Sequence, residues 1–159
     1  MPADMFLKLD GIDGESNDAN HKNEIEIENY SFGVAQQGTM AYGGGGGAGK
    51  AQFQDLHFTK RVDKATPNLF VAAATGRHIA SALLTVRKAG GQQEEYLKVT
   101  LKDVIISNYS TSGSEGAVPL EAIALNFTEA RYEYSPQSRS GSLEGSIIGG
   151  YNVKENRRI

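Results

Sequence analysis

Residues 95–108 of the chain read EYLKVTLKDVIISN, and this stretch decides the fold class. Apolar residues alternate along it with charged or hydroxyl residues, Leu97, Val99, Leu101 and Ile105 against Lys98, Thr100 and Lys102. A period of two residues is that of a β-strand with one buried side and one solvent-facing side. Residues 81–88 (SALLTVRK) precede it, and the turn-forming residues 89–92 (AGGQ) separate the two. The sequence therefore predicts a β-hairpin.

Upstream of this hairpin the same period recurs. In residues 5–10 it places Met5, Leu7 and Leu9 on one face and Phe6, Lys8 and Asp10 on the other. Residues 11–23 are polar and rich in turn-forming residues, which predicts a loop. In residues 24–34 (EIEIENYSFGV) the apolar side changes phase near Asn29. That change predicts a bulge or a strand that bends between two sheets.

Two more strands are predicted on either side of a helix. Residues 52–62 alternate, with Leu56, Phe58 and Val62 on one face and Phe53, His57 and Arg61 on the other. Residues 120–134 alternate through Ile123, Leu125 and Phe127 and follow a Ser/Gly loop at 110–116. The helix is predicted within residues 63–79, with Thr66 as N-cap, Pro67 at its first position and Gly76 just after its end.

The predicted fold is mainly β: a small antiparallel β-barrel of two packed sheets with one short flanking α-helix. A chain of 159 residues suffices for one domain, so residues 1–159 are expected to form a single domain. Residues 135–150 are rich in small residues, and residues 151–157 form a short last strand or a tail. A loose C-terminal tail is therefore expected from about residue 135.

Composition excludes several classes of protein. The net charge of −3 argues against a nucleic-acid binder, which usually presents a basic face. The chain has no cysteine, so disulfides and thiolate metal sites are ruled out. The N-terminus shows neither the basic nor the apolar region of a signal peptide, and no apolar run approaches the about 20 residues that span a bilayer.

Glycine is the unusual residue, with 19 copies, five of them consecutive at 43–47. The letters of residues 44–50 fit G-x-x-x-x-G-K, the pattern of a phosphate-binding loop. Such a loop needs a helix directly after it and a Ser or Thr after the lysine, whereas Ala51 has no hydroxyl and residues 52–62 alternate as a strand. We therefore reject nucleotide binding.

No catalytic, cofactor or metal residue is expected. The histidines His21, His57 and His78 lack zinc-ligand spacing, and no G-x-S-x-G nucleophile motif is present. The acidic loop of residues 13–18 lacks the spacing of a calcium-binding loop. Glu24, Glu26 and Glu28 share one strand face, which fits a solvated face or a surface that meets basic groups better than a pair of catalytic carboxylates.

Several blocks together resemble a known family. They are MFLKL (5–9), GESxDxxH (14–21), SFG (31–33), GGGGGAGK (43–50), QDLHFTK (54–60), DKATPNL (63–69), RKAGG (87–91), EYLKVTLK (95–102) and LNF (125–127). They resemble the haemolysin-coregulated protein (Hcp) family, the tube subunits of bacterial type VI secretion. The resemblance spans nearly the whole chain and is weakest over residues 135–159. Tyr30 and Phe32 stand where relatives often carry tryptophan.

The resemblance implies a non-enzymatic structural protein without a cofactor. Members of the family form hexameric rings that stack into a tube. A contractile sheath expels the tube, which is tipped by a VgrG-type spike protein, and small effector proteins can ride in the ring lumen. The resemblance also implies a cytoplasmic protein that is secreted through the apparatus without a signal peptide, with no nucleic-acid partner and no membrane insertion.

Within this role, the glycine-rich segment is expected to reach a neighbouring subunit or the next ring. A segment that orders only on contact gives weak, reversible affinity, because its ordering cost offsets part of the contact energy. The expected contact residues are Gly38, Met40, Tyr42, Gly43, Gly44, Gly45, Gly46, Gly47, Gly49 and Lys50. Met40, Tyr42 and Phe53 are the expected anchors. Ser31, which points opposite to Tyr30 and Phe32, is the expected lumen-facing residue.

Two alternatives share part of this pattern. A phage-type tail-tube protein would have the same architecture and assembly. A monomeric β-sandwich binding module would have the same strands, but it would expose aromatic side chains in a cleft.

Overall fold

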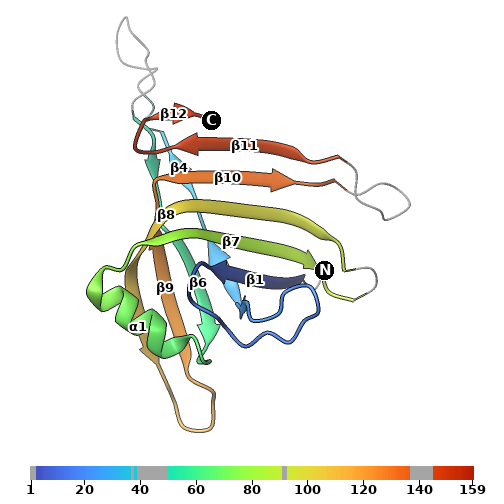
Figure 1. Cartoon of the computed structure of the whole chain (residues 1–159), viewed down its shortest axis with the longest axis vertical. Helices are drawn as coiled ribbons and strands as arrows, with labels where there is room; N and C mark the ends of the chain where they lie inside the picture. Colours follow the sequence, from blue (N-terminus) through green and yellow to red (C-terminus); the bar gives the residue numbers. More distant parts are fainter. Residues whose placement is uncertain (1–2, 37, 39–49, 91–92, 137–144) are drawn as a thin grey trace, which may run out of the picture.

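The computed structural model describes residues 3–36, 38, 50–90, 93–136 and 145–159. In these residues it contains twelve strands and one helix (Figure 1). Their bounds are β1 Ala3–Leu9, β2 Ile25–Glu26, β3 Asn29–Ser31, β4 Val34–Ala35, β5 Gln52–Phe53, β6 Leu56–Arg61, α1 Thr66–Thr75, β7 Ile79–Lys88, β8 Glu95–Ser112, β9 Leu120–Asn126, β10 Glu129–Tyr134, β11 Ile147–Asn152 and β12 Arg157–Arg158.

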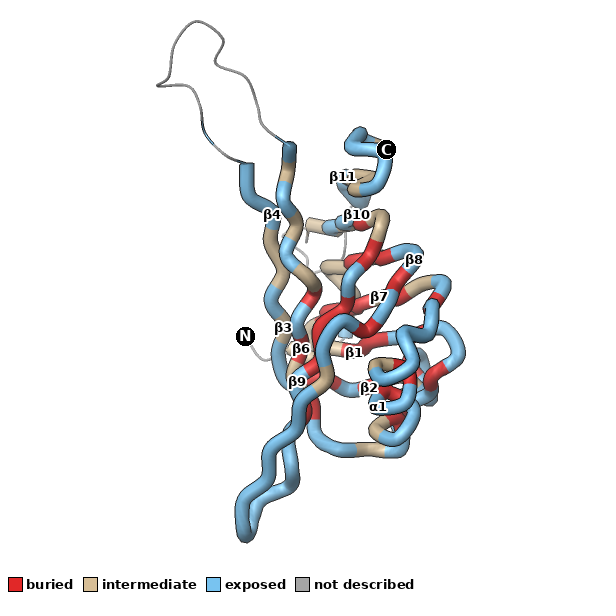
Figure 2. The backbone as a smooth tube through the Cα atoms, turned by 90° about the vertical axis from the view of Figure 1, so that its left-hand side faces the viewer, coloured by how far each residue is buried: buried red, intermediate tan, exposed pale blue. Residues whose placement is uncertain are grey.

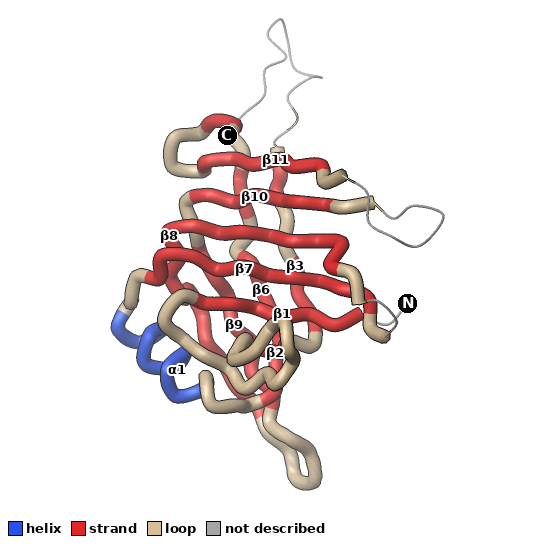
Figure 3. The backbone as a smooth tube through the Cα atoms, turned by 45° about the vertical axis from the view of Figure 1, so that its right-hand side comes forward, coloured by secondary structure: helices blue, strands red, loops and turns tan. Residues whose placement is uncertain are grey.

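The strands form two antiparallel sheets, as the sequence predicted. Sheet A has the order β12-β11-β10-β8-β7-β1-β2, and sheet B has the order β3-β6-β9-β8. The short strands β4 and β5 pair separately as a two-stranded ribbon. In Figure 3 the strands of sheet A run across those of sheet B, with α1 at one side. The predicted hairpin of β7 and β8 is confirmed.

Strand β8 belongs to both sheets. Its first part pairs with β7 and β10 in sheet A, and its second part, from Ile105 onward, pairs with β9 in sheet B. At the junction Asp103 adopts a positive φ of 51°, a conformation that Asp tolerates better than most residues. The pairing then shifts register between Ile106 and Asn108. These irregularities turn the strand from one sheet into the other.

The second passage between the sheets lies between β2 and β3. The Ile27 amide donates to Met5 O in sheet A, and the Glu28 amide donates to Thr59 O in sheet B. The bend predicted near Asn29 is therefore confirmed. The predicted barrel is not closed, because among the described strands β2 pairs only with β1 and β3 pairs only with β6.

The hydrophobic core lies between the two sheets and under α1 (Figure 2). Rows of cross-strand neighbours face each other across it, such as Leu7, Leu84 and Val99 from sheet A. Sheet B contributes Phe58 and Ile123, which are also buried. Each fully buried side chain of this kind contributes about 1.5–3 kcal/mol.

Helix α1 matches the predicted segment except at its start. Pro67 lies in its first turn, and Gly76 ends it with a φ of 65°. Thr66 is not the N-cap: that position is Ala65, which makes no side-chain cap. Instead, Thr66 Oγ1 accepts a hydrogen bond from the Asp63 amide and donates one to Glu121 on sheet B. The threonine thus connects the start of the helix to the sheet.

Three predicted segments have different bounds. Residues 120–134 are not one strand but two, because β9 pairs in sheet B and β10 pairs in sheet A. The loop predicted at 110–116 starts later, since β8 extends to Ser112. Residues predicted to be loose after 135 include β11, which pairs along its whole length with β10, and β12, which pairs with β11.

Two predicted faces also need correction. Phe6, expected on the polar side of β1, is 3% exposed, because the loop after β1 covers that face. Val62, expected in the core, is 37% exposed, whereas Lys60 on the same strand face as Phe58 is fully buried. Of the described residues, none lies in a helix that is long and apolar enough to span a membrane.

Candidate assembly surfaces

The β4–β5 ribbon carries the predicted contact segment. Val34 pairs with Phe53 and Ala35 pairs with Gln52, and the ribbon projects beyond sheet B at one end of the molecule (Figure 2). Gly38 and Lys50 are exposed. The other predicted contact residues lie outside the described part of the chain: Met40, Tyr42, Gly43, Gly44, Gly45, Gly46, Gly47 and Gly49. The strands β5 and β6 after Lys50 agree with the rejection of a phosphate-binding loop.

Aromatic side chains fasten the base of this ribbon to sheet A. The ring of Phe53 stacks on Tyr151, with centroids 5.4 Å apart, and meets the edge of Phe127 at 6.1 Å. Phe32 lies 5.6 Å from Phe127 and 5.7 Å from Tyr132. Phe53, expected as an anchor for a neighbouring subunit, therefore packs within its own chain. These contacts hold the ribbon in a fixed direction relative to both sheets.

Ser31 lies on the solvent-facing side of sheet B. It is exposed on edge strand β3, and its cross-strand neighbours in the same row are His57, Ala124 and Asn108. The next row on this face holds four more small or polar residues. They are Asn29, Thr59, Ala122 and Ser110. Apart from the exposed His57, these two rows carry no ionisable side chain, whereas Asp55 and Arg61 lie in the rows on either side of them.

A buried ion-pair network connects sheet B to the start of α1. Lys60 Nζ lies 2.5 Å from Glu121 Oε1 and 2.7 Å from Asp63 Oδ1, and neither Lys60 nor Glu121 is exposed. Glu121 also accepts hydrogen bonds from the hydroxyls of Thr66 and Tyr109. Burial, together with the hydrogen bond to Glu121, raises the pKa of Tyr109 to about 12. Each charged group of the network lies beside a group of opposite charge, so no buried charge is left uncompensated.

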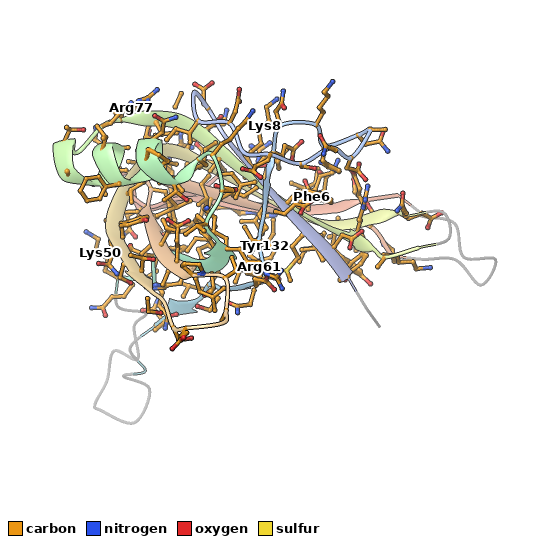
Figure 4. All side chains as sticks on the ribbon, turned by 90° about the horizontal axis from the view of Figure 1, so that it is seen from below. Phe6, Lys8, Lys50, Arg61, Arg77 and Tyr132 are labelled. Carbon is orange, nitrogen blue, oxygen red and sulfur yellow. The ribbon has the colours of Figure 1, made fainter. Side chains whose placement is uncertain are left out.

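A second polar cluster holds the loop after β1 against sheet A. Arg87 on β7 is 3% exposed, and its guanidinium binds Asp18 at 2.5 Å and Asp4 at 3.3 Å. The hydrogen bond from Arg87 lowers the pKa of Asp18 to about 2. The same guanidinium lies 4.7 Å from the ring centroid of Phe6, a cation–π contact. Figure 4 shows Phe6 on β1 with the side chains around it.

His21 closes the other side of this cluster. Its ring stacks on Phe6 with centroids 4.4 Å apart. Its Nδ1 lies 3.0 Å from Glu24 and its Nε2 lies 2.6 Å from Glu95 on β8. The motif GESxDxxH therefore has a structural role in this fold, because Asp18 and His21 fix the loop to two different strands.

His57 and His78, the remaining histidines, are both exposed. His57 is exposed on sheet B, and His78 lies 3.4 Å from the exposed Asp103. Within the described ranges, no group of three or more His, Asp or Glu side chains is arranged to hold a metal ion.

A cleft lies where the loop after β1 meets the ends of β2 and β6. Its volume is about 490 Å³. Six carboxylates and two guanidiniums line it, from Asp4, Glu15, Asp18, Glu26, Glu28, Asp63, Arg61 and Arg87. The cleft could not be located from the sequence, because its carboxylates come from four separate segments. The only hint was the run of alternating acids at 24–28.

Residues 6–134 match the family described as type VI secretion system effector, Hcp. Protein hcp1 of Pseudomonas aeruginosa is 47% identical over 159 residues, which cover 98% of each chain.

Solved structures agree with this match. The crystal structure of Hcp1 from Salmonella typhimurium is 41% identical, aligns over 100% of both chains and has a TM-score of 0.84. The structure of a type six secretion system protein is 31% identical, covers 99% of this chain and 100% of its own, and has a TM-score of 0.94. The chain belongs to the Hcp family of type VI secretion proteins. The resemblance seen in the sequence is confirmed.

Proposed function

We propose that this protein is a structural subunit of the type VI inner tube. Copies of the chain form hexameric rings, the rings stack, and a contractile sheath expels the stack behind a VgrG-type spike protein. The observation that carries this proposal is the membership of the Hcp family, with a match over residues 6–134. The protein acts without catalysis or a cofactor. It is made in the cytoplasm and leaves the cell through the apparatus.

Sheet B supports the proposal by its shape and its surface. Its outermost strands, β3 and the second part of β8, are each paired on one side within the chain. A ring arises when one surface of a subunit binds a different surface of the next copy and the rotation closes. Placed on the inside of such a ring, the nearly uncharged rows around Ser31 would form a lumen wall that small effectors can pass.

Negative-stain electron microscopy of the purified protein tests this function. We expect particles with six-fold symmetry and an open centre. A preparation that contains only monomers would overturn the ring and would favour a binding module instead.

Ser31 provides a sharper test of the lumen. The substitution Ser31→Tyr adds a large ring to the exposed side of β3, whereas Ser114→Tyr places the same group on the exposed β8–β9 turn. We expect Ser31→Tyr to change which small proteins co-purify with the ring from the producing bacterium, and Ser114→Tyr to leave them unchanged. Equal cargo in all three proteins would contradict a lumen position for Ser31.

A further inference from the structure

The two ends of sheet A carry opposite charge, although the chain as a whole has a net charge of only −3. Strand β2 ends the sheet on one side, and β12 ends it on the other. Glu26 and Glu28 lie at the β2 end, and both are exposed. Arg157 and Arg158 form β12 itself and are also exposed. In Figure 1 the C-terminal strand lies at one end of sheet A, and the loop after β1 lies beyond β1 toward the other end of that sheet.

At the acidic end, the charges inside the cleft differ in how far they are already paired. Arg87 is occupied by Asp4 and Asp18, and Asp63 is bound to the buried Lys60. Those pairs leave Glu15, Glu26 and Glu28, all exposed, of which Glu15 accepts a hydrogen bond from the Lys64 amide. Glu28 contacts Arg61 at 2.8 Å, but both side chains of this pair are largely exposed, at 45% and 66%. Such an exposed pair stabilises the protein by about 0.2–1 kcal/mol, so either side chain can leave it and pair with a charge on another molecule.

At the basic end, the strand is short and its outer edge is unpaired among the described strands. Arg157 pairs with Asn152 of β11 and Arg158 pairs with Tyr151. Lys154 lies in the exposed turn just before β12, and Glu155 contacts the Arg157 side chain. Three cations and one carboxylate therefore lie within residues 154–158.

We propose that the β12 end of one copy docks on the β2 end of a second copy, so that the charge of each end is met by its complement. This inference rests on the proposed function, because it identifies the contact as the one between stacked rings. A contact between two different surfaces of identical copies repeats from copy to copy, and it either closes into a ring or continues along an axis; we assign this contact to the axis. The partner is a second copy rather than another basic protein, since the chain carries the complement of its own acidic end.

The strength of such a contact suits a tube that must later come apart. Exposed ion pairs are individually weak, but a ring repeats them around its circumference, and linked contacts add up. Screening shortens the range of these charges from about 10 Å at 0.1 M salt to about 3 Å at 1 M. Stacks should therefore dissociate into rings as salt is raised.

Two charge-reversal variants test the contact. The first, Arg157→Glu with Arg158→Glu, makes both ends acidic. The second, Glu26→Lys with Glu28→Lys, makes both ends basic. Matched controls place the same changes in the middle of sheet A: Lys102→Glu with Arg131→Glu, and Glu129→Lys with Glu133→Lys. Size-exclusion chromatography reports the ring, and sedimentation reports the stack. A zero-length carbodiimide cross-linker captures weak stacks by joining Lys154 to the carboxylates of Glu26 or Glu28.

Each reversed variant should keep its ring and lose stacks and cross-links by at least about tenfold, the effect of about 1.4 kcal/mol. An equal mixture of the two variants should recover stacks, because the acidic ends of one then meet the basic ends of the other. The controls should behave like the unchanged protein.

Three results would overturn the contact. They are stacking that persists in the reversed variants, rings of the unchanged protein that give neither stacks nor cross-links, and loss of the ring in a reversed variant while its control stays intact. Absence of rings in the unchanged protein would overturn the proposed function, and the contact with it.

Discussion

Lys60 and Glu121 form an ion pair with no exposure to solvent, in the core between sheet B and α1. Removing one partner of a buried pair leaves the other as an uncompensated charge, which costs about 3–5 kcal/mol. We expect Lys60→Met to lower the free energy of unfolding by that amount in urea titrations. Arg61→Met, on the next residue but exposed, should change it by less than about 1 kcal/mol. Equal effects of the two substitutions on the free energy of unfolding would contradict a stabilising role of the buried pair.

Asp18 should make the stability of the protein depend on pH in acid. Its pKa is lowered to about 2 in the folded state from 3.8, chiefly by the hydrogen bond from Arg87. A lowered folded-state pKa stabilises the fold above the unfolded value, and this contribution disappears as pH falls from about 4 to about 2. In urea titrations across this range, the difference in free energy of unfolding between the unchanged protein and Asp18→Asn should decrease as pH falls. A difference that stays constant would show that Asp18 does not titrate with folding.

At the scale of residues, the sequence predicts faces well where apolar residues alternate and poorly where charge is buried. Period-two alternation correctly placed Leu56 and Phe58 in the core. Lys60 has the same parity, but nothing near it shows that Glu121 lies across the sheet to pair with it. Phe6 was misplaced for a related reason, because its cover comes from a loop that looks entirely solvated in the sequence.

Among the elements, the passage of the chain between the two sheets was predicted at one bend and missed at another. The phase change near Asn29 revealed the passage from sheet A to sheet B. The break between β9 and β10 was missed, although the apolar side changes phase there as well, from Ile123, Leu125 and Phe127 to Ala130, Tyr132 and Tyr134. Strand β8 was predicted as one long strand, but Ile105, placed on its buried face, is 39% exposed, because Val104 and Ile106 face the core where the strand passes into sheet B.

The β4–β5 ribbon allows a test of the glycine-rich segment as an assembly element. Ala35 and Gln52 are paired, so a two-residue Asn-Gly turn can join them in place of residues 36–51. We expect this variant to fold with unchanged urea stability, because Phe53 keeps its contacts with Phe127 and Tyr151. Electron microscopy should show far fewer stacked rings. Normal stacking by the shortened protein would contradict a contact role for Gly38, Lys50 and the residues between them.

At the scale of the whole molecule, the two sheets carry different surfaces of the proposed assembly. Sheet B offers a small-residue face suited to a lumen. Sheet A presents opposite charges at its two ends, and the ribbon projects from the body at one end. The fold class follows from the sequence, whereas this arrangement of surfaces depends on which strands become neighbours in three dimensions.

Native mass spectrometry of the full chain tests the ring most directly. The account predicts one dominant species with six times the 17.1 kDa mass of the chain, even in salt that dissolves stacks. A dominant species of 17.1 kDa over the same range of protein concentration would contradict it.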